Sequence, residues 1–278
     1  MINVKSTILN SIKYLSLILG SLAAIIPILV VFFTSLKTGE EFRSTNPLTP
    51  PENWLNFANY KRAFFEAGML IGFMNTIIIL AAVLFGTIII GTMVAYVLDR
   101  FKFRGSKLIV GAFLLATLIP SVTTQVATFK VINFFGLFNS RLALIILGIG
   151  TDIMAIYIFI QFISNISVSL DESAMLEGAS YFTIYRKIIL PLLKPAIAVV
   201  IILKGIGVYN DFYTPFLYMP KNGLQTVSTC LFRFKGPYGA HWEVICAGII
   251  IAIIPTLIAF LFLQKYFYNG FTGGSVKS

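Results

Sequence analysis

Six long apolar runs dominate the chain and limit what it can fold into. They lie at roughly residues 14–36, 69–98, 108–129, 142–162, 196–218 and 244–264. Each can supply the ~20 residues that an α-helix needs to cross the hydrocarbon of a bilayer. A hydrophobic fraction of 58% and a charged fraction of 12% agree with this pattern. The sequence therefore predicts an all-α integral membrane protein with six transmembrane helices.

The first run is expected to remain in the protein as a membrane helix. It is too long for the core of a signal peptide, and the T-S-L-K-T-G-E-E-F that ends and follows it holds no small-residue cleavage site. We therefore assign residues 1–68 to a first helix at about 14–36 and an external loop. Residues 69–264 form the main transmembrane domain, and residues 265–278 a cytoplasmic tail.

The positive charges indicate how the chain lies in the membrane. The short loop D-R-F-K-F-R-G-S-K at residues 99–107 carries four basic residues and is expected to be cytoplasmic. Six spans then place both termini and residues 171–191 inside, and the charge-balanced residues 37–68 outside. Because the basic residues lie beside membrane segments, the net charge of +10 indicates lipid headgroups as partner and not nucleic acid.

The residue sets that most catalytic and metal sites require are missing from the sequence. It has one histidine, His241, which we read as incidental, and two isolated cysteines, Cys230 and Cys246, which we read as structural. No H-E-x-x-H, G-x-S-x-G or G-x-x-x-x-G-K-[ST] occurs. We therefore predict no catalytic residue, no metal site and no cofactor in this chain, so any energy comes from a gradient or a partner.

Residues 164–195 interrupt the apolar pattern with charged and small residues. Ser169 to Glu172 fit an S-x-x-E capping box that would open a short helix. Gly178 suits a left-handed turn that ends it. A second helix is expected from about Ser180 to residue 190, with two basic residues in its last turn. These features predict two short helices joined by a glycine elbow at the membrane surface.

The same stretch resembles a family motif. E-S-A-M-L-E-G-A followed by I-I-L-P is similar to the EAA motif of ABC importer permeases. Five further segments resemble, in the same order, segments of maltose-permease-type carbohydrate importers. They are F-M-N-T-I-I-I-L, A-Y-V-L-D-R-F-K-F-R-G-S-K, G-L-F-N-S-R-L-A-L-I-I, V-Y-N-D-F-Y-T-P-F-L-Y-M and G-F-T-G-G-S-V-K-S. The likeness covers about residues 70–278. Ser167 and Ser169 depart from it, replacing a proline and a glutamate upstream of the motif.

The resemblance implies a type I ABC importer permease fold (MetI-like) and a set of partners. These are a second permease chain, two ATPases that bind ATP and Mg, and an extracytoplasmic sugar-binding protein, at a prokaryotic cell membrane. Residues 164–195 would form the cytoplasmic coupling loop, and residues 270–278 are a further candidate for ATPase contact. The residues that the motif implies for ATPase coupling are Glu172, Ser173, Ala174, Glu177, Gly178 and Ala179.

Polar residues within the apolar runs are candidates for a translocation path, because ionisable groups in hydrocarbon normally face a cavity or a partner. They are Gln125, Asp152, Lys204, Tyr209, Asn210 and Asp211. Two readings stay open: Asp152 and Lys204 form a structural ion pair, or they line the path of a sugar.

The resemblance favours a subunit of a carbohydrate importer. Alternatives are a permease for glycerol phosphates or polyamines, a self-contained carrier or channel, and, least favoured, a membrane enzyme.

Overall fold

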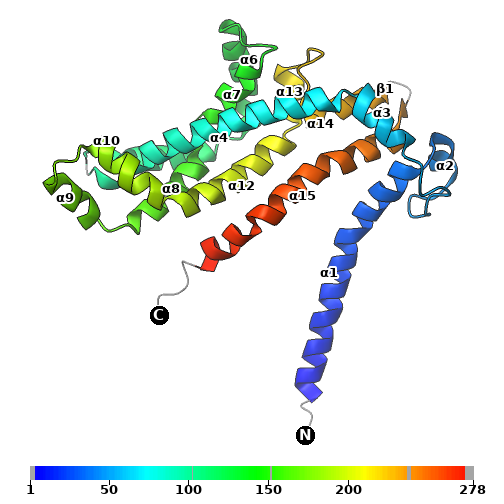
Figure 1. Cartoon of the computed structure of the whole chain (residues 1–278), viewed down its shortest axis with the longest axis horizontal. Helices are drawn as coiled ribbons and strands as arrows, with labels where there is room; N and C mark the ends of the chain where they lie inside the picture. Colours follow the sequence, from blue (N-terminus) through cyan, green and yellow to red (C-terminus); the bar gives the residue numbers. More distant parts are fainter. Residues whose placement is uncertain (1–3, 102, 151, 237–238, 273–278) are drawn as a thin grey trace. The chain divides into compact units, whose positions relative to one another are not determined.

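The computed structural model describes residues 4–101, 103–150, 152–236 and 239–272, and most of them are α-helical (Figure 1). The chain divides into two compact units. The first comprises Met1–Leu70 and Cys230–Pro255, and the second comprises Ile71–Thr229 and Thr256–Ser278. Residues 273–278, part of the tail for which an ATPase contact is expected, lie outside the described residues.

The first unit contains the first long helix of the chain, the beginning of the last one, and short elements that lie between them in the sequence. Its elements are α1 (Val4–Leu36), α2 (Gly39–Ser44), α3 (Ala58–Glu66), the 3-10 helix η2 (Leu231–Phe234), the antiparallel strands β1 (Lys235–Gly236) and β2 (Gly239–Ala240), and the start of α15 (Trp242–Thr272). Helix α15 continues beyond the end of the apolar run at residue 264, so part of the expected tail is helical.

The second unit is built from helices of very different lengths. They are α4 (Met69–Arg100), α5 (Ser106–Thr117), α6 (Ser121–Phe134), α7 (Arg141–Ile149), α8 (Ile153–Ser164), α9 (Ser169–Leu176), α10 (Tyr181–Ile184), the π-helix η1 (Tyr185–Ile189), α11 (Leu190–Leu192), α12 (Lys194–Asn210), α13 (Tyr213–Tyr218) and α14 (Val227–Cys230). In Figure 1, α9 and α10 lie at the end of this unit where α4 ends.

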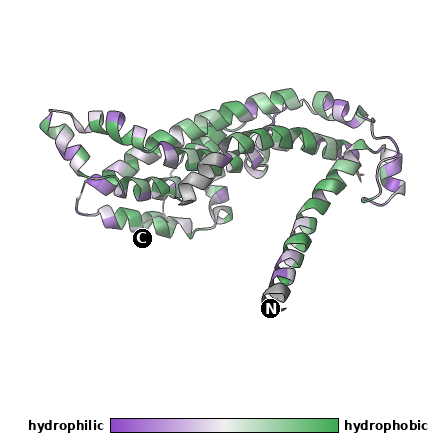
Figure 2. Ribbon diagram, turned by 60° about the horizontal axis from the view of Figure 1, so that its bottom comes forward, coloured by the Kyte–Doolittle hydropathy of each residue, from purple (hydrophilic) through white to green (hydrophobic). Residues whose placement is uncertain are grey.

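Among the described residues, three helices are long and apolar enough to cross a membrane without a break: Asn10–Leu36 within α1, Met69–Arg100, and Trp242–Phe262 within α15. Three bent pairs also qualify, with bends of 103° between α5 and α6, 41° between α7 and α8, and 70° between Tyr181–Leu192 and Lys194–Asn210. The count therefore reaches six if each pair is one span, in agreement with the six apolar runs. Figure 2 shows hydrophobic residues along the long helices and hydrophilic residues gathered near α9 and α2.

Proline and glycine explain where the spans break. Pro120 precedes α6 and has no N–H to continue the helix before it. Gly150 ends α7, and Pro195 is the second residue of α12, which begins after the bend at Leu193. Long apolar runs predict that a segment lies in the membrane, but the bend angles depend on the helices packed against it.

The loop after α1 is ordered by buried polar side chains. Lys37 is fully buried and donates from Nζ to Thr45 Oγ1 and to the Asn46 carbonyl, both at 2.9 Å. Thr38 and Glu41 form a reciprocal capping box at the start of α2. A buried polar group that keeps its hydrogen bonds holds its segment in one conformation.

The isolated histidine and cysteines also have defined places. His241 Nδ1 lies 3.1 Å from Glu243 Oε1 ahead of α15. Cys230 and Cys246 are both buried and form no disulfide with each other, and burial raises the pKa of Cys230 to about 12. Such a thiol is inert as a nucleophile, because the thiolate is the reactive form.

In the second unit, α4 and α7 pack in direct contact through glycines. A Cβ on Gly148 would lie 2.6 Å from Val83 Cγ2, and one on Gly86 would lie 2.6 Å from Ile149 Cδ1. Real Cβ atoms do not approach other atoms so closely. Small residues at a helix interface let backbones come near in a membrane, where packing replaces the hydrophobic effect as the driving force.

Gly148→Ala is accordingly expected to lower the free energy of unfolding by about 1–3 kcal/mol, the usual cost of overpacking a close contact. The measurement is the thermal unfolding midpoint of the purified protein in detergent. Gly111→Ala is the matched control, because a Cβ there meets nothing within 4 Å. Gly148→Ala combined with Val83→Ala should recover most of the loss, and an unchanged midpoint for Gly148→Ala alone would contradict the close approach.

Candidate functional site

A cavity lies within the second unit. Its volume is about 400 Å³, within the 300–1,000 Å³ typical of ligand pockets. Most of its wall is apolar and comes from α4, α7, α8 and α12. The polar side chains in the wall are Thr76, Asp152, Lys204, Asp211, Thr214 and Thr226.

Asp152 and Lys204 form an ion pair in this wall. Asp152 lies at the break between α7 and α8, where its Oδ1 accepts from the Ala155 N–H at 3.0 Å and caps α8. Its Oδ2 lies 2.8 Å from Lys204 Nζ on α12, with 17% and 23% of the two side chains exposed. The ion pair, one of the two readings that the sequence left open, is therefore present, and both partners also line the cavity.

The other candidate path residues separate into one that lines the cavity and three that do not. Asp211 follows α12, accepts from the Thr214 N–H at 3.0 Å and faces the cavity. Asn210 is exposed and bonds the Ile206 carbonyl of its own helix. Tyr209 is half-buried, and Gln125 on α6 donates to the Tyr213 hydroxyl. None of these three belongs to the lining, within the part of the chain that the structure describes.

Helix α9 begins differently from the sequence expectation. Val168 is its N-cap and Ser169 is already its first helical residue, with no side-chain cap. The Ser169 hydroxyl instead bonds the Ser167 hydroxyl at 2.7 Å. The predicted Ser169–Glu172 capping box is therefore wrong, because the helix starts one residue earlier than the box requires. Asp171 and Glu172 do lie in the first turn, where negatively charged carboxylates interact favourably with the positive end of the helix dipole.

The end of α9 is as expected. Gly178 has a φ of +85°, the left-handed conformation that glycine adopts without steric cost. The Gly178 N–H donates to the Met175 carbonyl and the Ala179 N–H to the Ala174 carbonyl, both at 2.9 Å. These two bonds form a Schellman motif, so the predicted glycine elbow is confirmed.

The second short helix starts at the predicted place but extends further. The Ser180 hydroxyl accepts from the Thr183 N–H and caps α10. The helix then passes through the π-helix η1 and ends at Leu192, so Arg186 and Lys187 lie in its middle and not in its last turn. π-helical turns are rare and recur at functional sites.

The residues of the motif divide between the surface and the interior. Ala174 is buried against a core that contains Ala95 and Tyr96 of α4, and Ala179 packs at its edge. The others face outward, and a Cβ added to Gly178 would meet nothing within 4 Å. The exposed members are Glu172, Ser173, Glu177 and Gly178. The elbow is thus an open surface supported from beneath by small residues.

Two polar contacts join motifs that are distant in the sequence. Asp171 is 3% exposed and its Oδ2 lies 2.6 Å from Nε of Arg100. Asn75 is fully buried, accepts from Arg141 Nε at 2.8 Å and donates to the carbonyls of Gly223 and Gln225. Sequence reasoning missed both contacts. The available signal was that Arg100, Asn75 and Arg141 all lie within segments that carry the family resemblance.

Comparison with known proteins agrees with this architecture. The family model described as "Binding-protein-dependent transport system inner membrane component" matches residues 87–272. The probable starch degradation products transport system permease protein AmyC of Thermoanaerobacterium thermosulfurigenes is 34% identical, over 95% of this chain and 97% of that protein. The galactooligosaccharides transport system permease protein GanQ of Bacillus subtilis is 32% identical, over 95% and 94%.

A solved structure shares the fold. A chain of a bacterial ABC transporter involved in the import of the acidic polysaccharide alginate matches with a TM-score of 0.83 and 21% identity, over 95% of this chain and 98% of that chain. This likeness confirms the expected importer permease fold. Together with the family match and the permease relatives, it establishes that the chain belongs to the family of binding-protein-dependent transport system inner membrane components.

Proposed function

We propose that this chain is one transmembrane subunit of an ATP-driven carbohydrate importer, and that it forms half of the translocation pathway. The observation that carries the proposal is the α9–α10 surface elbow, which shares one hydrophobic core with helices that also line a cavity with charged side chains in its wall. Such a subunit couples a partner's motion to a path for solute. The names of the relatives, which refer to starch degradation products and galactooligosaccharides, support a carbohydrate as that solute.

The coupling role belongs to residues 164–195. Glu172, Ser173, Glu177 and Gly178 would contact a cytoplasmic ATPase, because they are exposed around the elbow. Ala174 and Ala179 would transmit the contact, because they pack on the core beneath it. Since the sequence has no phosphate-binding loop, ATP and Mg would be bound by two partner ATPases.

The cavity is the proposed site of solute passage. Sugar hydroxyls donate and accept hydrogen bonds, and Asp152, Lys204 and Asp211 offer acceptors and donors in its wall. The hydroxyls of Thr76, Thr214 and Thr226 extend this set. Tyr209, Asn210 and Gln125 remain candidates for neighbouring parts of the path, which a second permease chain would complete.

The proposed orientation follows the positive charges. The basic loop at residues 99–107 and the α9–α10 elbow would both lie in the cytoplasm of a prokaryotic cell, together with both termini. The segment with α2 and α3 would then lie outside, on the side from which a sugar-binding protein delivers its ligand.

Reconstitution of the complete transporter in liposomes tests this proposal. The chain, its second permease and the ATPases are assembled, and ATP hydrolysis is measured with binding protein loaded with different oligosaccharides. At least one oligosaccharide should stimulate hydrolysis and be taken up. The chain alone in liposomes should transport nothing.

Two outcomes would overturn the proposal. Uptake by the chain alone would identify a self-contained carrier or channel. Stimulation by a glycerol phosphate or a polyamine, with no response to any sugar, would identify a permease for another solute.

A further inference from the structure

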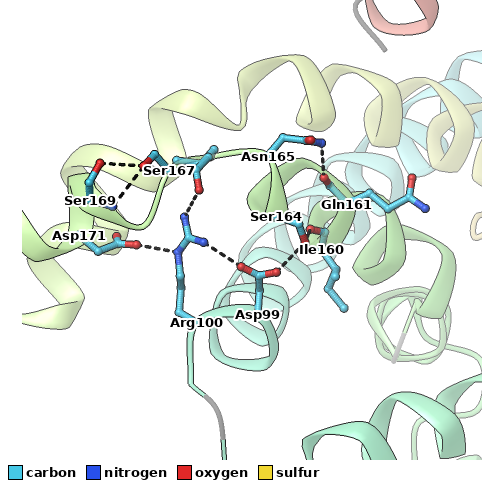
Figure 3. A network of polar contacts seen from close by, with 10 residues as sticks. Asp99, Arg100, Ile160, Gln161, Ser164, Asn165, Ser167, Ser169 and Asp171 are labelled. Carbon is cyan, nitrogen blue, oxygen red and sulfur yellow. Dashed lines mark hydrogen bonds and ion pairs between the residues drawn. The ribbon is translucent and has the colours of Figure 1, made fainter. Parts of the chain in front are cut away.

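Arg100 connects three segments of the second unit at the end of α4 (Figure 3). Its Nε lies 2.6 Å from Asp171 Oδ2 in α9, and its Nη2 donates to the Ile166 carbonyl in the α8–α9 linker at 2.8 Å. Its Nη1 donates to Asp99 Oδ2 at 2.9 Å. A guanidinium can do this because it presents five donors in a rigid plane, which a lysine cannot reproduce.

Asp99 extends the connection to a further helix. Its second oxygen, Oδ1, accepts from the Ser164 hydroxyl at 2.6 Å, and Ser164 is the last residue of α8. The end of α8, the linker after it and the first turn of α9 are therefore all held to the last two residues of α4.

The pair of Arg100 and Asp171 is buried, and Arg100 is the charged partner beside Asp171. The side chains of Arg100 and Asp171 are 8% and 4% exposed. The contact between Asp171 Oδ2 and Arg100 Nε is an ion pair whose geometry does not meet the criteria for a hydrogen bond. Neither carboxylate oxygen of Asp171 has a hydrogen-bond partner within residues 4–101, 103–150, 152–236 and 239–272. Because a buried charge needs compensation, Asp171 keeps its place only while Arg100 stays beside it.

Packing around the network links it to the helices that form the cavity wall. Ala174 of α9 and Tyr185 of η1 share a core with Tyr96 of α4, and the Tyr185 hydroxyl lies 2.9 Å from Thr92 Oγ1. Both α4 and α8 contribute residues to the cavity, among them Val83 and Ala155.

We propose that Arg100 is a positioning residue that makes α9 move as one piece with the adjoining ends of α4 and α8, so that a displacement imposed on α9 reaches the cavity wall. The inference rests on the proposed function in one respect, namely that a partner ATPase displaces α9. The ion pair between Arg100 and Asp171 would transmit that displacement, in addition to any contribution to the stability of the fold.

Asp171→Asn in the complete transporter tests this inference. The substitution keeps the size of the side chain, and Arg100 retains Asp99 and Ile166, so no charge is left unpaired. ATP hydrolysis stimulated by loaded binding protein should continue. Uptake per ATP hydrolysed should fall by about tenfold, within the 5- to 150-fold range of typical coupling between sites.

Controls separate coupling from folding. Asn165→Ala removes a neighbouring side chain that bonds the Gln161 carbonyl of α8, and it should leave uptake per ATP unchanged. Ser164→Ala removes the support of Asp99, together with a bond to the Ile160 carbonyl within α8, and it should lower uptake per ATP hydrolysed by a smaller factor than Asp171→Asn does. It serves as the test if Asp171→Asn does not assemble.

The contrary outcomes are distinct. If uptake and hydrolysis fall together in Asp171→Asn, or neither changes, the ion pair is structural and the inference is wrong. If the unmodified transporter shows no hydrolysis that responds to binding protein, the proposed function itself fails.

Discussion

Replacing Gly178 by glutamate is expected to abolish uptake while the chain still folds and inserts. Within the chain the cost is limited to backbone strain of about 1–2 kcal/mol for a side chain at positive φ, because a Cβ at this position would meet nothing within 4 Å. The larger cost arises at the partner, where a charged side chain would project from the elbow into the proposed ATPase contact. Uptake per ATP should fall by about 100-fold, near the upper end of typical coupling free energies.

Two further variants separate strain from obstruction. Gly178→Asn keeps the left-handed turn, which asparagine tolerates, and still adds a side chain at the surface, so it should impair uptake as well. Gly105→Glu is the matched control, because Gly105 also has a positive φ of +103° and open space but lies outside the proposed coupling segment. Normal uptake in Gly178→Glu, with ATP hydrolysis unchanged, would remove the elbow from the mechanism.

Features set by local chemistry could be predicted from the sequence. Gly178 ends α9 because only glycine adopts its backbone conformation without cost, and six apolar runs correspond to at most six spans. The pairing of Asp152 with Lys204 was also open to inference, since two opposite charges in apolar runs have few other partners.

Features set by packing between distant segments could not be predicted. The charge of Asp171 was already explained by its position in the first turn of a helix, and nothing in the sequence indicated that Arg100 lies beside it. The capping box failed for a related reason. Ser169 fits the pattern, but Val168 is the N-cap of α9 and Ser169 is its first helical residue, after a linker whose Ile166 carbonyl is bound by Arg100. The bends at Pro120 and Leu193 lie next to prolines, but their angles depend on the helices packed against each half.

The cavity was visible in the sequence only as a set of candidate residues. Asp152, Lys204 and Asp211 could be grouped from the sequence because each is a charged residue in or beside an apolar run, and the three do line one cavity. Tyr209 and Asn210 were grouped with them by sequence proximity, but successive residues on a helix point in different directions. The threonines of the cavity wall carried no signal, since threonine is common on helices for unrelated reasons.

Lys204→Met is expected to have the second large effect. Removing one partner of a buried ion pair costs about 3–5 kcal/mol, because the other charge remains without compensation. Asp152 would retain the Ala155 N–H as a hydrogen-bond donor, and the pair is 17–23% exposed, so we expect a loss at the lower end of this range. The thermal unfolding midpoint of the purified protein measures it, with Lys194→Met as the control because Lys194 is an exposed lysine on the same helix.

The double variant Lys204→Met with Asp152→Asn decides whether the pair serves the fold or the solute. Asparagine caps a helix about as well as aspartate, so the double variant keeps the start of α8 and leaves no charge unpaired. Its stability should therefore recover toward that of the unmodified chain. If the pair were only a structural bridge, uptake would recover with stability. Because both side chains line the cavity, we expect instead a stable transporter whose uptake stays about tenfold low, since a lost hydrogen bond to a charged group costs about 1.5–3 kcal/mol.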